Sequence, residues 1–299
     1  MRTKLSLLLF LFVNFYMLAQ DRIGIAFIPI AYDEESVSNS DARMIHESII
    51  NSFVKTKRFA VVDREKLQAL EDKKKLQRTE SFIDSKQTIQ DGVSRGASYL
   101  IATNILSLRH SEIKRGWESM LQVQVKVIDV STGEIIATEN ITSEYIEPSK
   151  MIIDAREKFA SKKEIKAMEE KTQKMQEIKM HKEDAFSVAL ERLDENMKTF
   201  SNRNFPITLD ILGWDVKNKN LFTIAAGSGI GLSQGQLLDV VHTTEATIGD
   251  RTVTRNQKIA VACIIKVEDT NFSEALIIST EKAYKKVRES NGAIKILTK

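Results

Sequence analysis

The first part of the chain alternates between apolar runs that predict strands and amphipathic runs that predict helices. Residues 23–30 are almost continuously apolar, as in a strand that is buried on both faces. After a polar loop, Ser40 or Asp41 is placed to cap a helix. Apolar residues recur at every fourth position of this helix and give it a buried face. That face carries Ile45, Ile49 and Phe53.

Further strands follow and predict a single sheet. Residues 59–62 form the next strand, and a helix over residues 85–95 stops before a strand at 99–106. Residues 121–127 alternate between apolar and polar side chains, which indicates a strand with one face exposed to water. A turn then sends the chain back, antiparallel, over residues 135–141. We therefore expect a mixed sheet with helices packed on it.

A long charged segment comes next, with no proline or glycine between Pro148 and Pro206. Its Lys and Glu residues follow helical periodicity, and a thin apolar seam widens from residue 185 onward. The seam begins with Ile165, Met168, Met175 and Ile178. We expect one long helix whose second half packs on the first domain and whose first half projects. The projecting half is either solvated or engaged in a coiled-coil contact.

After Pro206 the pattern changes to short apolar strands separated by glycine turns. This pattern predicts a small β-barrel or β-sandwich, with a helix near residues 281–290 and a closing strand at 293–297. The other strand candidates are residues 207–212, 221–225, 237–242, 259–267 and 275–278.

The predicted fold is therefore α/β (α+β). It combines a mixed sheet with packed helices, a long charged helical insertion and a second small, all-β, barrel-like domain. The expected divisions are residues 20–148, 149–204 and 205–299, after a signal peptide at residues 1–19.

Residues 1–19 have the features of a cleaved secretory signal. Arg2 and Lys4 precede a short apolar run at residues 7–13, and Ala19 is a suitable cleavage residue. No cysteine lies near the cleavage point, so we do not expect a lipoprotein. An uncleaved anchor is the alternative, but the apolar run falls short of the about 20 residues that span a bilayer. The remaining chain contains no long apolar stretch.

Charge and cysteine content narrow the possible partners. Removal of the signal peptide lowers the formal net charge from +3 by the two charges of Arg2 and Lys4. No cluster of basic residues stands out, so we expect neither nucleic acid nor a charged membrane surface as a partner. Cys263 is the single cysteine, which rules out an internal disulfide, and its apolar neighbours indicate a buried, unreactive thiol.

Motifs of bond-making chemistry are weak in this sequence. The glycine run at residues 227–231 lacks the Lys–Ser/Thr pair of a phosphate loop and precedes a predicted strand, so a β-turn fits it better. The four histidines do not follow metal-ligand spacing. We therefore expect no catalytic, cofactor-binding or metal site, and no cofactor. The candidate loop site is Asp33, Glu34 and Glu35, which could bind a cation or supply acid and base, or could simply be solvated.

Four short segments carry a family resemblance. They are the Ile–Pro end of the first strand at residues 28–29, the strand that ends in Asp63 and Arg64, the step from Gly96 and Ala97 into a strand, and the strand–turn with Asp129, Thr132 and Gly133. In this order they resemble the curli-secretion (CsgG-like) family, over about residues 22–142 and again over 185–200. We expect these motif residues to be structural. The segment after Pro206, with Gly235 before a strand, resembles the C-terminal β domain of flagellar T-type proteins.

The resemblance implies binding and assembly, because the CsgG-like family includes an outer-membrane curli secretion pore and periplasmic activators of penicillin-binding proteins. Its domain also resembles the N-terminal domain of the Tol system's periplasmic protein. This chain departs from the pore form, since it lacks the lipid-acceptor cysteine. Residues 109–120 also leave little room for a membrane hairpin, each strand of which needs about 9–11 residues.

We therefore expect a non-enzymatic adaptor of the periplasm that works in envelope assembly or secretion. Its expected partners are envelope proteins, with self-association and peripheral docking at the outer membrane as further contacts. Two alternatives stay open. One is an oligomeric outer-membrane secretion component, and the other is a ligand-binding protein or a regulator of a cell-wall enzyme.

Overall fold

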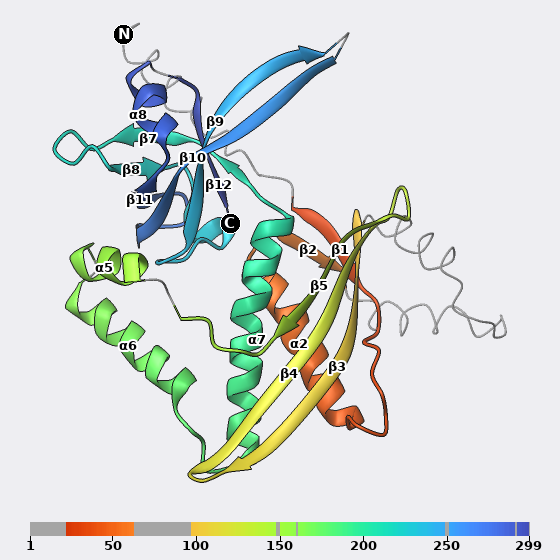
Figure 1. The fold of residues 1–299 in the computed structure, drawn as a ribbon. Helices are drawn as coiled ribbons and strands as arrows, with labels where there is room; N and C mark the ends of the chain where they lie inside the picture. The colour runs from red at the N-terminus through yellow and green to blue at the C-terminus, as the bar shows by residue number, and fades with distance from the viewer. Residues whose placement is uncertain are drawn as a thin grey trace, which may run out of the picture.

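The structure is a computed structural model that describes residues 22–62, 97–147, 150–159, 161–248, 251–290 and 292–298. Within these residues the chain forms two sheets, each with its own hydrophobic core, and a set of helices beside them (Figure 1). The predicted α/β (α+β) class, with a charged helical insertion and a second, barrel-like β unit, is confirmed. None of the helices in the described ranges combines the length and apolar content needed to cross a membrane.

The first sheet is mixed and has five strands in the order β2-β1-β3-β4-β5. β1 runs parallel to β2 and β3, whereas β3, β4 and β5 are antiparallel neighbours. The alternation predicted for β4 is confirmed, because Val123, Val125 and Val127 are completely buried. The strands are β1 (Ile23–Phe27), β2 (Phe59–Val62), β3 (Tyr99–Ile113), β4 (Gly116–Asp129) and β5 (Ile135–Thr142).

Two helices, α2 (Asn39–Lys55) and α7 (Lys182–Asn204), pack against this sheet and against each other (Figure 1). Their apolar faces meet the valines of β4, with Phe53 and Phe200 among the largest fully buried side chains. Burial of such side chains is the main stabilising term of this unit, at about 1.5–3 kcal/mol for each.

The start of α2 differs from the prediction of a cap at Ser40 or Asp41. Ser38 is the N-cap residue, and its hydroxyl accepts a hydrogen bond of 3.1 Å from the backbone N–H of Asp41. Asp41 instead lies in the first turn, where its carboxylate accepts from the Ser38 hydroxyl and favours the positive end of the helix. Sequence pattern alone does not choose between several polar residues that could each cap the helix.

The prediction of one long helix over residues 149–204 is wrong. The chain forms three helices, α5 (Lys150–Phe159), α6 (Lys162–Gln176) and α7. The break before α7 has a tertiary cause, because the backbone N–H of Trp117 donates to the carbonyl of Lys179 at 2.7 Å and draws that segment into an isolated β-bridge. The first half does not project alone. α6 folds back on α7, and α5 contacts two strands of the second sheet, β10 (Arg251–Val267) and β11 (Ser273–Thr280).

The second sheet has seven strands in the order β6-β12-β9-β10-β11-β8-β7. Helix α8 (Lys282–Glu289) adds Tyr284 and Val287 to its core, as the predicted helix near residues 281–290 suggested. The strands are β6 (Thr208–Leu209), β7 (Ile211–Trp214), β8 (Leu221–Ile224), β9 (Leu237–Ile248), β10 (Arg251–Val267), β11 (Ser273–Thr280) and β12 (Ile294–Thr298). The boundaries at residues 148 and 205 that we predicted between domains stay predictions.

The hairpin of β9 and β10 in the second sheet is longer than the sequence suggested. β9 and β10 pair from Cys263 with Leu237 out to Arg251 with Ile248, and their outer ends project from the rest of the unit (Figure 1). Residues 244–247 and 252–258 of this arm are exposed and mostly polar. Nothing in the described chain covers them, which explains why they lack the alternation of a half-buried strand.

Candidate functional site

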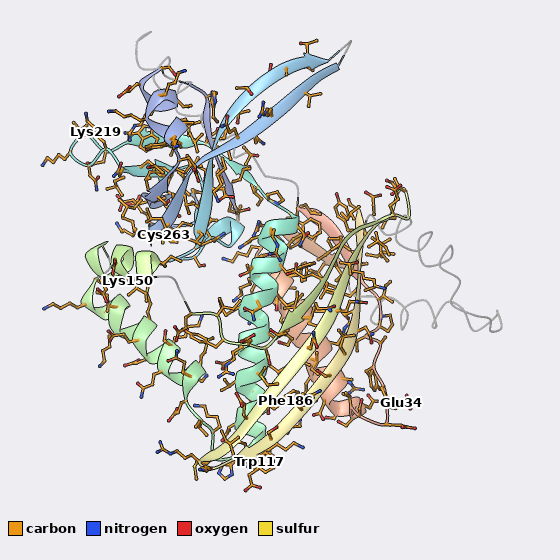
Figure 2. All side chains as sticks on the ribbon, in the orientation of Figure 1. Glu34, Trp117, Lys150, Phe186, Lys219 and Cys263 are labelled. Atoms are coloured by element: carbon orange, nitrogen blue, oxygen red, sulfur yellow. The ribbon has the colours of Figure 1, made fainter. Side chains whose placement is uncertain are left out.

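The acidic loop at Asp33, Glu34 and Glu35 lies between β1 and α2, and all three residues are exposed. Figure 2 shows Glu34 on the outer side of this loop. The carbonyl of Asp33 accepts from the backbone N–H groups of Ser36 and Val37, at 3.2 and 3.0 Å, and its carboxylate accepts from the N–H of Glu35 at 3.2 Å. Asp33 therefore shapes a turn. No group of three potential metal ligands gathers within the ranges that the structure describes.

The strand–turn motif at Asp129 forms a tightly hydrogen-bonded turn. The carboxylate of Asp129 accepts from the hydroxyl of Ser131 at 2.5 Å and from the backbone N–H of Thr132 at 3.1 Å. These bonds, that from the Ser131 hydroxyl first, lower the pKa of Asp129. Gly133 closes the turn with a φ of 75°, a conformation that favours glycine. This geometry supports the structural role that we expect for Asp129, Thr132 and Gly133.

The Gly–Ala–strand motif lies beside this turn, although the two are far apart in the sequence. Ala97 is buried in a small cluster with Leu100 and Val130. The backbone of Ser98 joins the segments, because its N–H donates to Gly24 at 2.7 Å and its carbonyl accepts from Val130 at 3.0 Å. The remaining motif residues, Asp63, Arg64 and Gly96, lie outside the described residues.

Cys263 and the glycine run both have structural environments. Cys263 is completely buried in β10, in agreement with the prediction of a buried thiol (Figure 2). The glycine run contains a short 3-10 helix, Ser228–Ile230, and not the start of an α-helix. Its Gly227 packs so closely on Asp269 that an added Cβ would lie 2.2 Å from that carbonyl. The geometry fits a packed turn better than a phosphate site.

A charged cluster that the sequence pattern did not reveal links α2, α6 and α7. Asp194 is only 8% exposed and lies 3.2 Å from Lys55 and 2.9 Å from Lys198. Glu195 pairs with Lys198 at 3.2 Å and with Lys171 at 2.8 Å. Burial acts to raise the pKa of Asp194, but the hydrogen bonds of Lys198, Ser52 and Lys55, together with the charge of Lys198, lower that pKa overall. The cluster joins α7 to α2 through Lys55 and to α6 through Lys171.

Arg58 lies buried at the junction of the two sheets, where its guanidinium donates to the carbonyl of Phe205 at 3.3 Å and to the hydroxyl of Thr298 at 3.2 Å. Its Nε atom has no hydrogen-bond partner in the described structure. Burial lowers the pKa of Arg58 to about 10. Thr298 also accepts from the N–H of Ile207 at 2.9 Å, so one hydroxyl ties the first unit to both ends of the second.

A groove of about 600 Å³ runs between α5 and α6, and we call it the α5–α6 groove. The apolar seam that we predicted in the charged segment supplies part of its floor through Ile165 and Met168, whereas Met175 is buried against α7. The lining residues are Tyr145, Ile153, Glu157, Ile165, Met168, Glu169, Thr172, Gln173, Gln176 and Glu177.

Comparison with known proteins gives one family match. Residues 35–139 match the family model described as "Peptidoglycan-synthase activator LpoB". This stretch includes α2 and most of the first sheet. No curated protein matches the chain.

Several solved structures show a distant likeness. The LpoB C-terminal domain from Escherichia coli is 17% identical, with 41% of this chain and 83% of that one covered and a TM-score of 0.30. The PelC dodecamer from Paraburkholderia phytofirmans is 14% identical, covers 40% and 70%, and has a TM-score of 0.29. TolB from Acinetobacter baumannii is 10% identical, covers 88% and 51%, and has a TM-score of 0.24. With TM-scores this low, these likenesses support no conclusion about the fold or the function of this chain. The chain is therefore similar, over residues 35–139, to peptidoglycan-synthase activators.

Proposed function

We propose that this chain is a non-enzymatic protein of the cell envelope that binds a peptidoglycan synthase and regulates its activity. The family match over residues 35–139 is the observation that carries the proposal. It agrees with one branch of the predicted resemblance, the activators of penicillin-binding proteins. The signal peptide predicted at residues 1–19 supports export, and we propose the periplasm as the site of action.

The geometry of the first sheet and its helices suits a binding platform. The acidic loop and the Asp129 turn use their polar groups for internal hydrogen bonds. The first sheet is backed by α2 and α7, and the charged cluster around Asp194 fixes these helices. A surface held in this way keeps its shape when a partner binds, which lowers the entropy cost of association.

The direct test is a reconstitution with purified proteins. Residues 20–299 would be mixed with a membrane synthase that polymerises and cross-links glycan strands, solubilised in detergent. We expect co-purification of the two proteins and a change in the rate of glycan synthesis. An exported protein of similar size serves as the control. If the synthase neither binds the chain nor changes rate at micromolar concentrations, the proposal is wrong.

A second candidate is an oligomeric outer-membrane secretion component of the CsgG-like family. This candidate comes from the predicted resemblance, and two of the motif segments, at Ser98 and Val130, are joined by a backbone hydrogen bond of 3.0 Å. Analytical ultracentrifugation separates the candidates, since a ring of many subunits supports secretion and a monomer contradicts it. Cell fractionation would locate the chain in the periplasm or at the outer membrane.

The ligand-binding alternative rests on the acidic loop. Under this alternative, replacement of Asp33, Glu34 and Glu35 by Ala would abolish ligand binding or the activity that depends on it. Under the proposed function, the triple variant still binds the synthase, because these side chains are exposed and lie in a turn.

A further inference from the structure

We propose that the α5–α6 groove binds the apolar face of a cationic amphipathic helix from a partner protein. All the residues that line the groove lie between residues 145 and 177, outside the stretch that matches the activator family. The inference therefore goes beyond the proposed function and does not depend on it.

The floor of the groove has the shape that a helix requires. Ile165, Met168 and Thr172 follow one another at helical spacing along one face of α6. Ile153 of α5 forms the opposite wall and is 40% exposed, so apolar surface is left uncovered. The lined part of α6 corresponds to a length of about 18 Å, which accommodates about three turns of a second helix.

The charges on the rim select the kind of helix. Glu157 and Glu169 line the groove and form no ion pair with a described residue, whereas a third lining carboxylate, Glu177, pairs with Lys179 at 2.7 Å. No lysine or arginine is among the described lining residues. Two lysines of α6, Lys171 and Lys174, pair with carboxylates of α7, and Lys166 lies 3.8 Å from Glu170 of α6 itself. An apolar floor between acidic rims complements a helix with an apolar stripe flanked by lysine or arginine.

The length of the groove suits a helix. The lining residues of α6 begin at Ile165 and end at Gln176, and the neutral polar ones, Thr172, Gln173 and Gln176, lie at the C-terminal end of the helix. An extended partner can contact both the apolar part and this polar end.

The test uses a fluorescein-labelled synthetic peptide of about 18 residues, long enough for a marginally stable helix. Leucine occupies positions i, i+3, i+4 and i+7 of each repeat, and lysine occupies most others. Fluorescence anisotropy with residues 20–299 measures the dissociation constant. A peptide with glutamate in place of lysine, and one with the same composition but scrambled leucines, serve as controls. We expect both to bind at least about tenfold more weakly.

Variants of the protein locate the site. Ile153→Ser with Met168→Ser removes apolar surface from both walls, and we expect at least about tenfold weaker binding of the lysine peptide. The matched control is Leu106→Ser with Leu212→Ser, two exposed leucines elsewhere, at 42% and 56% exposure. Circular dichroism would verify that both double variants fold.

A second pair of variants tests the charge. Glu157→Gln with Glu169→Gln removes two rim carboxylates that form no ion pair with any described residue. We expect about threefold to tenfold weaker binding and a weaker dependence on salt. Glu118→Gln with Glu245→Gln makes the same charge change on exposed residues away from the groove.

Four results would overturn the proposal. The lysine peptide could fail to bind the wild-type chain, or could bind the groove variants as tightly as the wild type. The glutamate peptide could also bind equally well. If ultracentrifugation instead shows a dimer that Ile153→Ser with Met168→Ser dissociates, the groove holds a second copy of this chain and the proposed occupant is wrong.

Discussion

Arg58 holds a buried positive charge at the junction of the two sheets, and no described carboxylate neutralises it. Burial lowers its pKa to about 10, which means that the folded state disfavours the charged guanidinium. The two hydrogen bonds of the Arg58 side chain therefore hold Phe205 and Thr298 in place. Its desolvation lowers the stability of the folded state at neutral pH.

Substitution of Arg58 separates these effects. Arg58→Met keeps most of the volume without the charge, and we expect the free energy of unfolding to rise by about 1 kcal/mol at pH 7. Arg58→Ala leaves a cavity and should lower it by about 2–3 kcal/mol. Urea denaturation measures both. Because the unfolded state keeps its proton to higher pH, the wild type should gain stability relative to Arg58→Met as the pH rises through about 10.

Asp194 shows the opposite pH behaviour. Its folded pKa is lowered, since the effect of burial is outweighed by the hydrogen bonds of Lys198, Ser52 and Lys55 together with the charge of Lys198. We expect Asp194→Asn to lower the free energy of unfolding by about 1–3 kcal/mol at pH 7, because Lys55 loses its partner and Lys198 keeps only Glu195. The stabilising contribution is present above about pH 4 and is lost as the pH falls through the folded pKa. A difference between variant and wild type that stays constant from pH 7 to pH 3 would contradict this.

The β3–β4 hairpin and the segment between α6 and α7 are held together by one close backbone approach. Gly116 has a φ of 145°, and an added Cβ would lie 2.2 Å from the carbonyl of Lys179. The neighbouring N–H of Trp117 donates to the same carbonyl at 2.7 Å. Glycine is therefore required at the tip of the hairpin, both for its conformation and for the space that it leaves.

Gly116→Ala should break the bridge between Trp117 and Lys179. We expect a loss of about 1–3 kcal/mol in the free energy of unfolding and faster hydrogen exchange at the Trp117 amide. Gly213→Ala is the matched control, because a Cβ there would meet no atom within 4 Å. Unchanged exchange at Trp117 in Gly116→Ala would show that the bridge does not hold the segment.

The two units of the molecule meet through a small set of contacts. Gly231, with a φ of 73°, packs on the end of α2, where an added Cβ would lie 2.1 Å from the carbonyl of Thr56. Lys57 donates to the carbonyl of Ser228 at 2.9 Å beside it. The insertion adds a second link, since α5 contacts the second sheet and α6 contacts α7 (Figure 1).

Gly231→Ala should disturb this junction without reaching either core. We expect the free energy of unfolding to fall by about 1–2 kcal/mol from backbone strain alone. Small-angle scattering should show a larger radius of gyration than in the wild type and in the control Gly213→Ala. If the scattering profile of Gly231→Ala matches the wild type, the junction does not depend on this contact.

Features that depend on neighbours in the sequence could be predicted. The alternation in β4 identified three valines that the structure buries completely, and the apolar run around Cys263 predicted its burial. The predicted cap of α2 and the single long helix were wrong, because several polar residues compete at a helix start and a bridge to Trp117 interrupts the insertion. The sequence pattern did not predict the projecting arm of β9 and β10, because strands that no other element covers need no apolar alternation.

Some features of the candidate sites could also be predicted from the sequence, and others could not. Apolar and polar periodicity along the chain was enough to predict the class of the fold, the tight turn at Asp129 and the seam of the insertion. It could not predict that Lys55 meets Asp194, that Arg58 is buried, or that Ile153 and Ile165 face one groove. Periodicity acts between residues a few positions apart, whereas ion pairs and grooves join residues that only folding brings together.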